Sequence, residues 1–123
     1  MNDRTLIFVY GTLMRGGCRA HVLRPQTFLG EARTVAAYRL YDCGSYPGLV
    51  EAQDGLRIHG ELWSVDARCI HRLDRIEAVD EGLYERTTVQ LDHPSTDQVV
   101  QAYLYAQSVN GLRDCGERWI NAV

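Results

Sequence analysis

The segment TLIFVYGTLMRGG, residues 5 to 17, joins an apolar run to a glycine-rich stretch. Residues 5–10 predict a β-strand, and because the run from Leu6 onward is apolar at every position we expect both faces to be covered. Gly11 follows the strand directly. A glycine at the end of a buried strand allows a ligand to approach backbone N–H groups closely. The segment therefore predicts either a tight turn or a loop that binds an anion.

A phosphate-binding loop is one alternative for this segment. Gly11 and Gly16 have the GxxxxG spacing, but Gly17 and Cys18 stand where such a loop has lysine and serine or threonine. We therefore do not expect a nucleoside triphosphate. A row of N–H donors also holds a carboxylate or a developing oxyanion, and neither ligand requires a lysine.

The bulk composition predicts one soluble globular domain over residues 1–123. Apolar residues make up 46% of the chain and charged residues 24%, and the net charge is −3. An acidic balance argues against a nucleic-acid or membrane-surface partner. We expect no signal peptide, and no apolar run reaches the ~20 residues that cross a bilayer. Four scattered cysteines without zinc-site spacing indicate reduced thiols, so we expect a cytoplasmic protein. The sequence does not indicate an oligomeric state.

The rest of the chain reads mostly as strands. The expected strands after the first are residues 28–40, 56–65, 84–91 and 99–106, with a loop over residues 41–48. The turn cluster at residues 93–97 predicts a hairpin between the last two strands. Five or six strands joined by short loops indicate a sheet curled into a small barrel.

One helix is expected, from residue 66 to about residue 79, with Asp66 as its N-cap. Its apolar face comprises Cys69, Ile70, Leu73 and Ile76. Glu77 follows Leu73 by four residues and lies on the same face. Burial and the negative end of the helix dipole both raise the pKa of a carboxyl group there. Glu77 is therefore either a general acid and base in a cavity, or a helix-end glutamate that is solvated or paired with Arg86.

Other reactive side chains give weaker patterns. Cys18 and His21 are three residues apart and would form a nucleophile and base pair if that segment were helical. His59, His71 and His93 are dispersed and predict no metal site. Tyr103 and Tyr105 share one face of the last strand; they fill the core, or one hydroxyl reaches a ligand.

Several of these motifs together resemble the γ-glutamylcyclotransferase-like superfamily, including its γ-glutamylamine cyclotransferases. The matching motifs, in chain order, are V-Y-G-T-L at residues 9–13 followed by Arg15-Gly16, G-E-L-W at 60–63, L-D-x-x-E at 73–77, Y-x-R at 84–86 and Y-x-Y at 103–105. They span nearly the whole chain. Gly16-Gly17-Cys18 departs from the family loop, and nothing after residue 106 matches.

The resemblance implies an α+β fold, a small mixed β-barrel with flanking helices and a cavity at one side. It implies a metal-independent enzyme without a cofactor that releases 5-oxoproline and an amine or amino acid from a small γ-glutamyl amide. Glu77 would be the catalytic acid and base. The expected substrate-binding residues are Tyr10, Gly11, Thr12, Leu13, Tyr84 and Tyr105. Two alternatives stay open: a non-catalytic binding domain of the same fold, and a hydrolase that uses Cys18 and His21.

Overall fold

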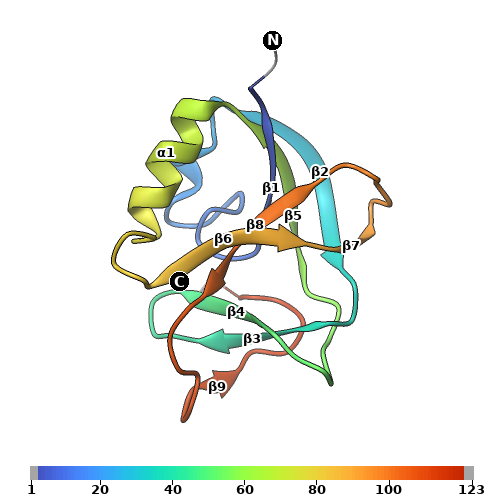
Figure 1. Ribbon diagram of the computed structural model, residues 1–123, viewed down its shortest axis with the longest axis vertical. Coiled ribbons are helices and arrows are strands. Elements are labelled where there is room, and N and C mark those ends of the chain that lie inside the picture. Colours follow the sequence, from blue (N-terminus) through green and yellow to red (C-terminus); the bar gives the residue numbers. More distant parts are fainter. Residues whose placement is uncertain (1–2, 121–123) are drawn as a thin grey trace.

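A computed structural model describes residues 3–120 of the chain, which form one sheet of nine strands, one α-helix and one 3-10 helix (Figure 1). The strands are β1 (Thr5–Val9), β2 (Thr27–Thr34), β3 (Tyr38–Asp42), β4 (Pro47–Glu51), β5 (His59–Val65), β6 (Tyr84–Val89), β7 (Leu91–His93), β8 (Val100–Tyr105) and β9 (Arg113–Asp114). The helices are η1 (Ala20–Val22), of the 3-10 type, and α1 (Ala67–Ile76).

The sheet branches at β8. The strand order is β7-β2-β5-β1-β8-β4-β3-β9, and β6 pairs with β8 along its other side. On their shared side, β1 pairs with β8 in parallel at Val100 and Gln101, and β4 pairs with it in parallel at Leu104. The Tyr10 hydroxyl bridges the gap between these two pairings, donating to the Tyr103 carbonyl (2.5 Å) and accepting from the Leu49 N–H (3.3 Å). The point where β1 and β4 separate is thereby held open by a side chain.

The mixed α+β sheet is confirmed, but it does not close into a barrel. Its end strands, β7 and β9, pair with β2 and β3 respectively and not with each other. In Figure 1 α1 covers one side of the sheet, and β3, β4 and β9 lie at the end of the molecule away from the start of β1. Closure fails because β8 divides one of its sides between two strands, so the sheet splays there.

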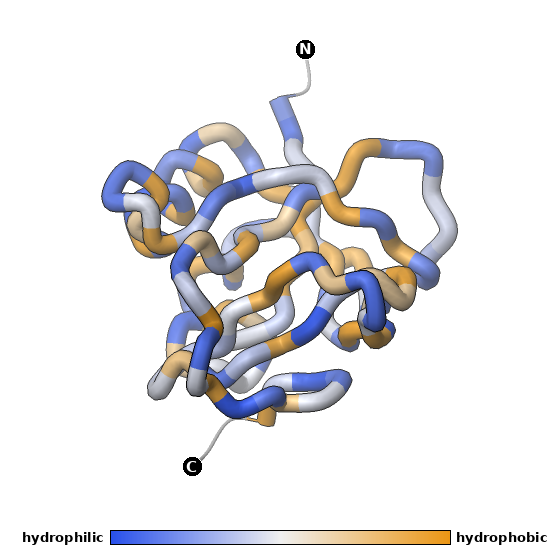
Figure 2. Tube along the Cα trace, turned by 60° about the horizontal axis from the view of Figure 1, so that its bottom comes forward, coloured by the Kyte–Doolittle hydropathy of each residue, from blue (hydrophilic) through white to orange (hydrophobic). Residues whose placement is uncertain are grey.

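Both faces of β1 are buried, as its apolar run predicts. Ile7 and Val9 belong to the cluster under α1, while Phe8 and Tyr10 belong to a second cluster on the other face. Residues of contrasting hydropathy alternate along much of the trace (Figure 2), as strands with unlike faces require.

Several predicted boundaries were wrong: β5 begins at His59 and not at residue 56, and the expected strand 84–91 is divided between β6 and β7. The expected strand 28–40 breaks between β2 and β3, where Val35 accepts from the Ala37 N–H (2.8 Å) and donates to the Gln90 carbonyl (3.1 Å). The expected loop 41–48 is largely a β3–β4 hairpin, in which Pro47 is the first residue of its strand. Proline is tolerated at that position, so turn chemistry in the sequence concealed a strand.

The helix starts as predicted. The Asp66 side chain accepts from the Cys69 N–H (2.8 Å), and Cys69, Ile70 and Leu73 are buried. Regular helix ends at Ile76, three residues before the expected end, and Glu77 is the C-cap. Neither helix in residues 3–120 is long and apolar enough to cross a membrane.

Candidate active site

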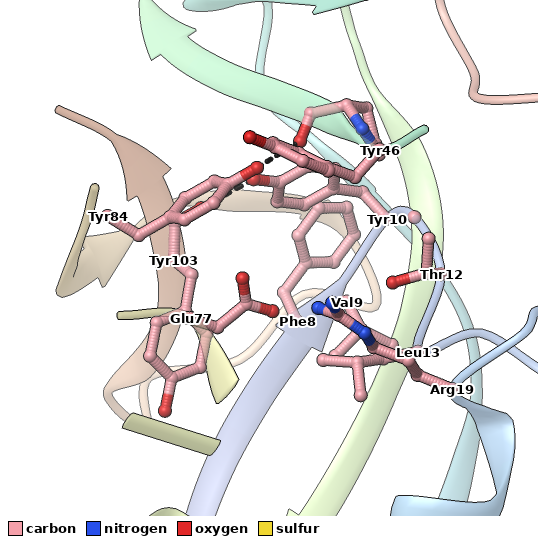
Figure 3. Close-up of a pocket in the computed structure, with 12 residues that line it drawn as sticks. Phe8, Val9, Tyr10, Thr12, Leu13, Arg19, Tyr46, Glu77, Tyr84 and Tyr103 are labelled. Atoms are coloured by element: carbon pink, nitrogen blue, oxygen red, sulfur yellow. Dashed lines mark hydrogen bonds between the residues drawn. The ribbon is translucent and has the colours of Figure 1, made fainter. Parts of the chain in front are cut away.

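A cavity lies where β1 and β4 separate, between the loop after β1 and the end of α1 (Figure 3). Its free internal volume is about 30 Å³, and it opens to solvent at its mouth. Its walls come from β1, β4, β6 and β8, from residues 10–13, and from Arg19, Tyr46 and Glu77. Segments that are distant in the sequence therefore meet around one space.

Two successive turns shape the loop after β1. The Met14 N–H donates to the Gly11 carbonyl (3.1 Å), and the Gly17 N–H donates to the Met14 carbonyl (2.9 Å). The Arg19 N–H returns to the Thr12 carbonyl (2.9 Å). The loop is thus closed by its own backbone and has no need of a bound ligand to hold its form.

Glu61 on β5 holds this loop against the sheet. Its carboxylate accepts from the Arg15 backbone N–H and from Arg15 Nε, both at 3.0 Å, and from Trp63 Nε1 at 3.1 Å. The Arg15 guanidinium also lies 3.9 Å from the centroid of the Phe28 ring. Glu61 is 6% exposed, and each of its oxygens has a donor. The carboxylate in the G-E-L-W motif is therefore structural.

The loop presents backbone donors at the cavity. Within residues 3–120, the N–H groups of Gly11, Thr12 and Leu13 donate to no other group, although all three residues are buried. A Cβ at Gly11 would lie 2.6 Å from Cγ of Pro47, so only glycine allows β4 to approach here. Consecutive buried donors without protein acceptors are suited to an anion or a carbonyl oxygen.

Glu77 reaches the same cavity from the opposite wall, and Figure 3 shows its carboxylate pointing into the space. No hydrogen bond or ion pair joins this carboxylate to another side chain of the described residues. Burial raises the pKa of Glu77 to about 7, and the Arg19 guanidinium opposes that rise. A carboxyl group that titrates near neutral pH exchanges protons with a substrate at low cost in either direction.

The helix end fixes the position of Glu77. Its N–H donates to the Leu73 carbonyl (2.9 Å), and the next residue, Ala78, has φ of 51°. This left-handed conformation ends the helix and is usually taken by glycine, because a Cβ there costs about 1 kcal/mol. The strain lies directly beside the carboxylate that points into the cavity.

A second clamp ties α1 to the sheet one turn earlier. Asp74 accepts from the Tyr103 hydroxyl (2.7 Å) and from Arg86 Nε (3.0 Å), and Arg86 also donates to Gln101 (2.8 Å). Arg86 is thus committed to Asp74. The alternative in which Arg86 pairs with Glu77 is wrong.

Tyrosines form much of the cavity wall, and three of their hydroxyls have partners. In addition to Tyr10, the Tyr84 hydroxyl donates to the Pro47 carbonyl (2.6 Å) and the Tyr103 hydroxyl donates to Asp74. Burial is the main cause that raises the pKa of Tyr10, Tyr84 and Tyr103. These phenols stay neutral and shape the cavity, so its formal charges are those of Glu77 and Arg19.

The structure brings five of the six predicted binding residues to the cavity: Tyr10, Gly11, Thr12, Leu13 and Tyr84. Tyr105 is not part of the lining. It lies at the end of β8, where its ring packs edge-on against Tyr84 with centroids 5.5 Å apart. Burial is the main cause that raises the pKa of its hydroxyl, and the neighbouring Cys43 thiol adds to the rise.

The Cys18 and His21 alternative receives no support from their placement. Both residues are exposed, neither lines the cavity, and no hydrogen bond joins them in the described part of the chain. Residues 3–120 also contain no group of three or more His, Cys, Asp and Glu side chains placed to hold a metal ion.

Arg19 and Tyr46 are cavity residues that the sequence patterns did not identify. Arg19 precedes the short η1 helix and Tyr46 lies in the β3–β4 turn. Neither position has a periodicity that predicts its direction. The R-G-G-C-R spacing alone does not indicate that the second arginine folds back toward the strand end.

Comparison with known proteins gives a consistent result. Residues 7–121 match the sequence model of the family described as gamma-glutamyl cyclotransferase, AIG2-like. A Vibrio cholerae protein whose name assigns it provisionally to the gamma-glutamylcyclotransferases is 36% identical over 118 residues, covering 96% of this chain and 97% of that protein. Human gamma-glutamylaminecyclotransferase is 31% identical over 121 residues, covering 84% of this chain and 78% of that protein. The crystal structure of a mouse AIG2-like protein superposes with a TM-score of 0.79 at 26% identity, covering 97% of this chain and 90% of that one.

Proposed function

The chain belongs to the gamma-glutamyl cyclotransferase, AIG2-like family, and we propose that it cyclises a small γ-glutamyl amide to 5-oxoproline and releases the amine or amino acid. The observation that carries this proposal is Glu77: a carboxyl group with pKa about 7 that points into a cavity opposite free backbone donors. We expect the reaction in the cytoplasm.

The nucleophile in this reaction is the α-amine of the substrate itself. It attacks the γ-carbonyl carbon, a ring N–C bond forms, and the amide C–N bond then breaks without water. Because both reacting groups belong to one molecule, the enzyme has no second reactant to orient. Its tasks are to move protons and to stabilise the negative charge that develops on the carbonyl oxygen.

Glu77 performs the proton transfers. It accepts a proton from the α-ammonium, which frees the lone pair for attack, and it delivers a proton to the departing nitrogen. Of the remaining ammonium protons, one stays on the ring nitrogen and one goes to solvent. Removing a proton from an amine of pKa about 8 costs ~5 kcal/mol for a glutamate of ordinary pKa, and ~1.4 kcal/mol at a pKa of about 7. Burial of Glu77 therefore lowers the barrier to the first step.

The free N–H groups of the loop face the developing charge. Backbone donors that are fixed before the reaction need no reorganisation when an oxyanion forms. The loop is held by its turns and by Glu61, and for this reason its donors remain in place when the cavity is empty.

The test is incubation of the protein with a panel of γ-glutamyl amino acids and γ-glutamyl amines, with 5-oxoproline measured by mass spectrometry. We expect stoichiometric 5-oxoproline and free amine from at least one class, and the same rate after dialysis against a chelator. Binding of γ-glutamyl compounds without turnover would instead identify a binding domain of the same fold.

A further inference from the structure

Arg19 is a cation that lines the cavity and has no role in the proton transfers or the oxyanion contacts of the proposed reaction. Its backbone is fixed, since its N–H donates to the Thr12 carbonyl (2.9 Å) and its carbonyl accepts from the Val22 N–H (3.1 Å). Its half-buried side chain lines the cavity, and within residues 3–120 it makes no hydrogen bond or ion pair. A guanidinium has five donors and no acceptor, so burying it in part without an acceptor carries a desolvation cost.

Arg19 and Glu77 face the cavity from opposite walls without forming an ion pair (Figure 3). Figure 3 shows the two side chains pointing toward each other, and the Arg19 guanidinium opposes the rise in the pKa of Glu77. A cation and an anion that face one cavity without pairing suit a ligand that carries both charges. The anion of the ligand then meets Arg19, and its cation meets Glu77. The head of a γ-glutamyl compound is such a ligand, with an α-ammonium and an α-carboxylate on one carbon atom.

We propose that Arg19 binds the α-carboxylate of the γ-glutamyl group, so that the site recognises the zwitterionic head between Arg19 and Glu77. This inference rests on the proposed function and names the part of the substrate that is read. The α-ammonium then lies at Glu77, which is where the first proton transfer requires it. Substrates whose α-carboxyl group is amidated are excluded, because they leave the guanidinium without an anion.

This assignment also divides the roles at the loop. With the α-carboxylate on Arg19, the N–H groups of Gly11, Thr12 and Leu13 are free for the γ-carbonyl oxygen. Those donors would otherwise be shared between a ground-state anion and the oxyanion. Interactions reserved for charge that develops during the reaction raise kcat, whereas those made with the ground state lower KM. Arg19 accordingly acts on binding, and the loop acts on the chemical step.

Occupation of Arg19 by a carboxylate also affects the base. Arg19 lowers the pKa of Glu77 in the empty cavity. The groups that face Glu77 from the loop after β1, from β6 and from β8 are the neutral tyrosines Tyr10, Tyr84 and Tyr103, so Arg19 is the cation that affects its pKa. Replacing Arg19 with a neutral residue is therefore expected to move the acid limb of kcat/KM to higher pH.

The direct test compares two probes that differ by one carboxylate: 5-oxoproline and 2-pyrrolidinone. By titration calorimetry, wild type should bind 5-oxoproline more tightly. Arg19→Gln should weaken 5-oxoproline binding about 10- to 100-fold, as for loss of a charge-assisted contact, and should leave 2-pyrrolidinone binding unchanged. Arg19→Lys should recover part of the loss. Arg24→Gln is the matched control, because Arg24 is exposed and lies outside the cavity.

Turnover distinguishes the α-carboxylate from a carboxylate on the leaving group. With γ-glutamylglycine and γ-glutamyl methylamide, Arg19→Gln should raise KM by about the same factor of 10 to 100. A loss confined to γ-glutamylglycine would assign Arg19 to the leaving group and overturn the inference. Unfolding temperatures of the variants are measured alongside, and the wild-type comparison of the two probes does not depend on any variant folding.

The two proposals fail in different ways. If wild type forms 5-oxoproline and Arg19→Gln keeps wild-type KM on both substrates, the Arg19 inference is overturned and the proposed function stands. Equal affinity of wild type for 5-oxoproline and 2-pyrrolidinone would also overturn the Arg19 inference. If wild type forms no 5-oxoproline from any γ-glutamyl compound, the proposed function fails and the inference fails with it.

Discussion

Glu61 in β5 is buried and Glu77 at the end of α1 is half-buried, and they differ in what surrounds the carboxylate. Glu61 accepts three hydrogen bonds, two from Arg15 and one from Trp63. Glu77 accepts none from a described side chain and has a raised pKa. The comparison separates two uses of a carboxylate that is shielded from solvent. The Glu61 carboxylate accepts hydrogen bonds that hold a loop, whereas the Glu77 carboxylate remains available to a ligand.

The first prediction, with the largest expected effect, removes the acid function of Glu77. Glu77→Gln keeps the shape of the side chain and abolishes proton transfer, so we expect kcat to fall about 10²- to 10⁴-fold. Glu85→Gln, an exposed carboxylate on β6, is the control and should keep wild-type turnover. Near wild-type kcat for Glu77→Gln on a confirmed substrate would remove Glu77 from the mechanism.

The second prediction concerns the structural partner. Glu61→Gln presents an amide N–H₂ to donors from Arg15 and Trp63, so one buried acceptor is lost and a donor faces a donor. We expect the free energy of unfolding to fall by about 2–4 kcal/mol in urea denaturation. Residual activity should show a raised KM, because the loop is less firmly held. Unchanged stability with a selective loss of kcat would exchange the roles of the two glutamates.

The fold could be predicted from sequence wherever one physical pattern dominated. The apolar run of β1 and the helical spacing of Cys69, Ile70 and Leu73 each indicated the right element, and the face of α1 correctly placed Glu77. The prediction failed where two effects competed. Pro47 and Gly48 are turn formers, yet they begin β4: the Tyr84 hydroxyl holds the Pro47 carbonyl, and a Cβ at Gly48 would lie 2.7 Å from the Tyr105 ring.

The motif residues of the candidate site could be predicted from the sequence, but the second charged group of the cavity, Arg19, could not. Tyr10, Gly11, Thr12 and Leu13 follow a strand end, which fixes where they lie. Arg19 reaches the cavity only because two consecutive turns and the hydrogen bond from its N–H to Thr12 reverse the chain. Such a reversal depends on tertiary contacts that include the Arg15–Glu61 anchor, and local propensity does not encode them.

A third prediction uses the pH dependence of stability. The folded pKa of Glu77 is about 7, above its ordinary value of 4.5, so between these pH values the folded state holds more of this proton than the unfolded state. The contribution of Glu77 to stability therefore falls as pH rises from about 4.5 to 7 and is constant above. The Glu77→Gln variant has no carboxyl group at this position, so its stability does not show this decrease with pH.

We expect Glu77→Gln to be more stable than wild type by up to about 3 kcal/mol at pH 8, with the difference disappearing toward pH 4.5. Urea denaturation of both proteins across this range measures it. The tyrosines around Glu77 have raised pKa values and stay neutral throughout. A difference that is the same at every pH would mean that Glu77 titrates normally in the folded protein.

The fourth prediction concerns the alternative in which Cys18 is a nucleophile and His21 is its base, and its expected effect on activity is the smallest. Cys18 is exposed and outside the cavity, so Cys18→Ser and His21→Ala should each keep activity within about threefold, as surface substitutions usually do. Mass spectrometry of the protein during turnover should show no acyl adduct, because cyclisation by the substrate's own amine forms no bond to the enzyme. A thioester on Cys18, or loss of activity in both variants while Glu77→Gln stays active, would move the chemistry away from the helix end. The contrast between Glu61 and Glu77 would then describe packing alone, and the active site would have to be rebuilt around the loop that carries Cys18.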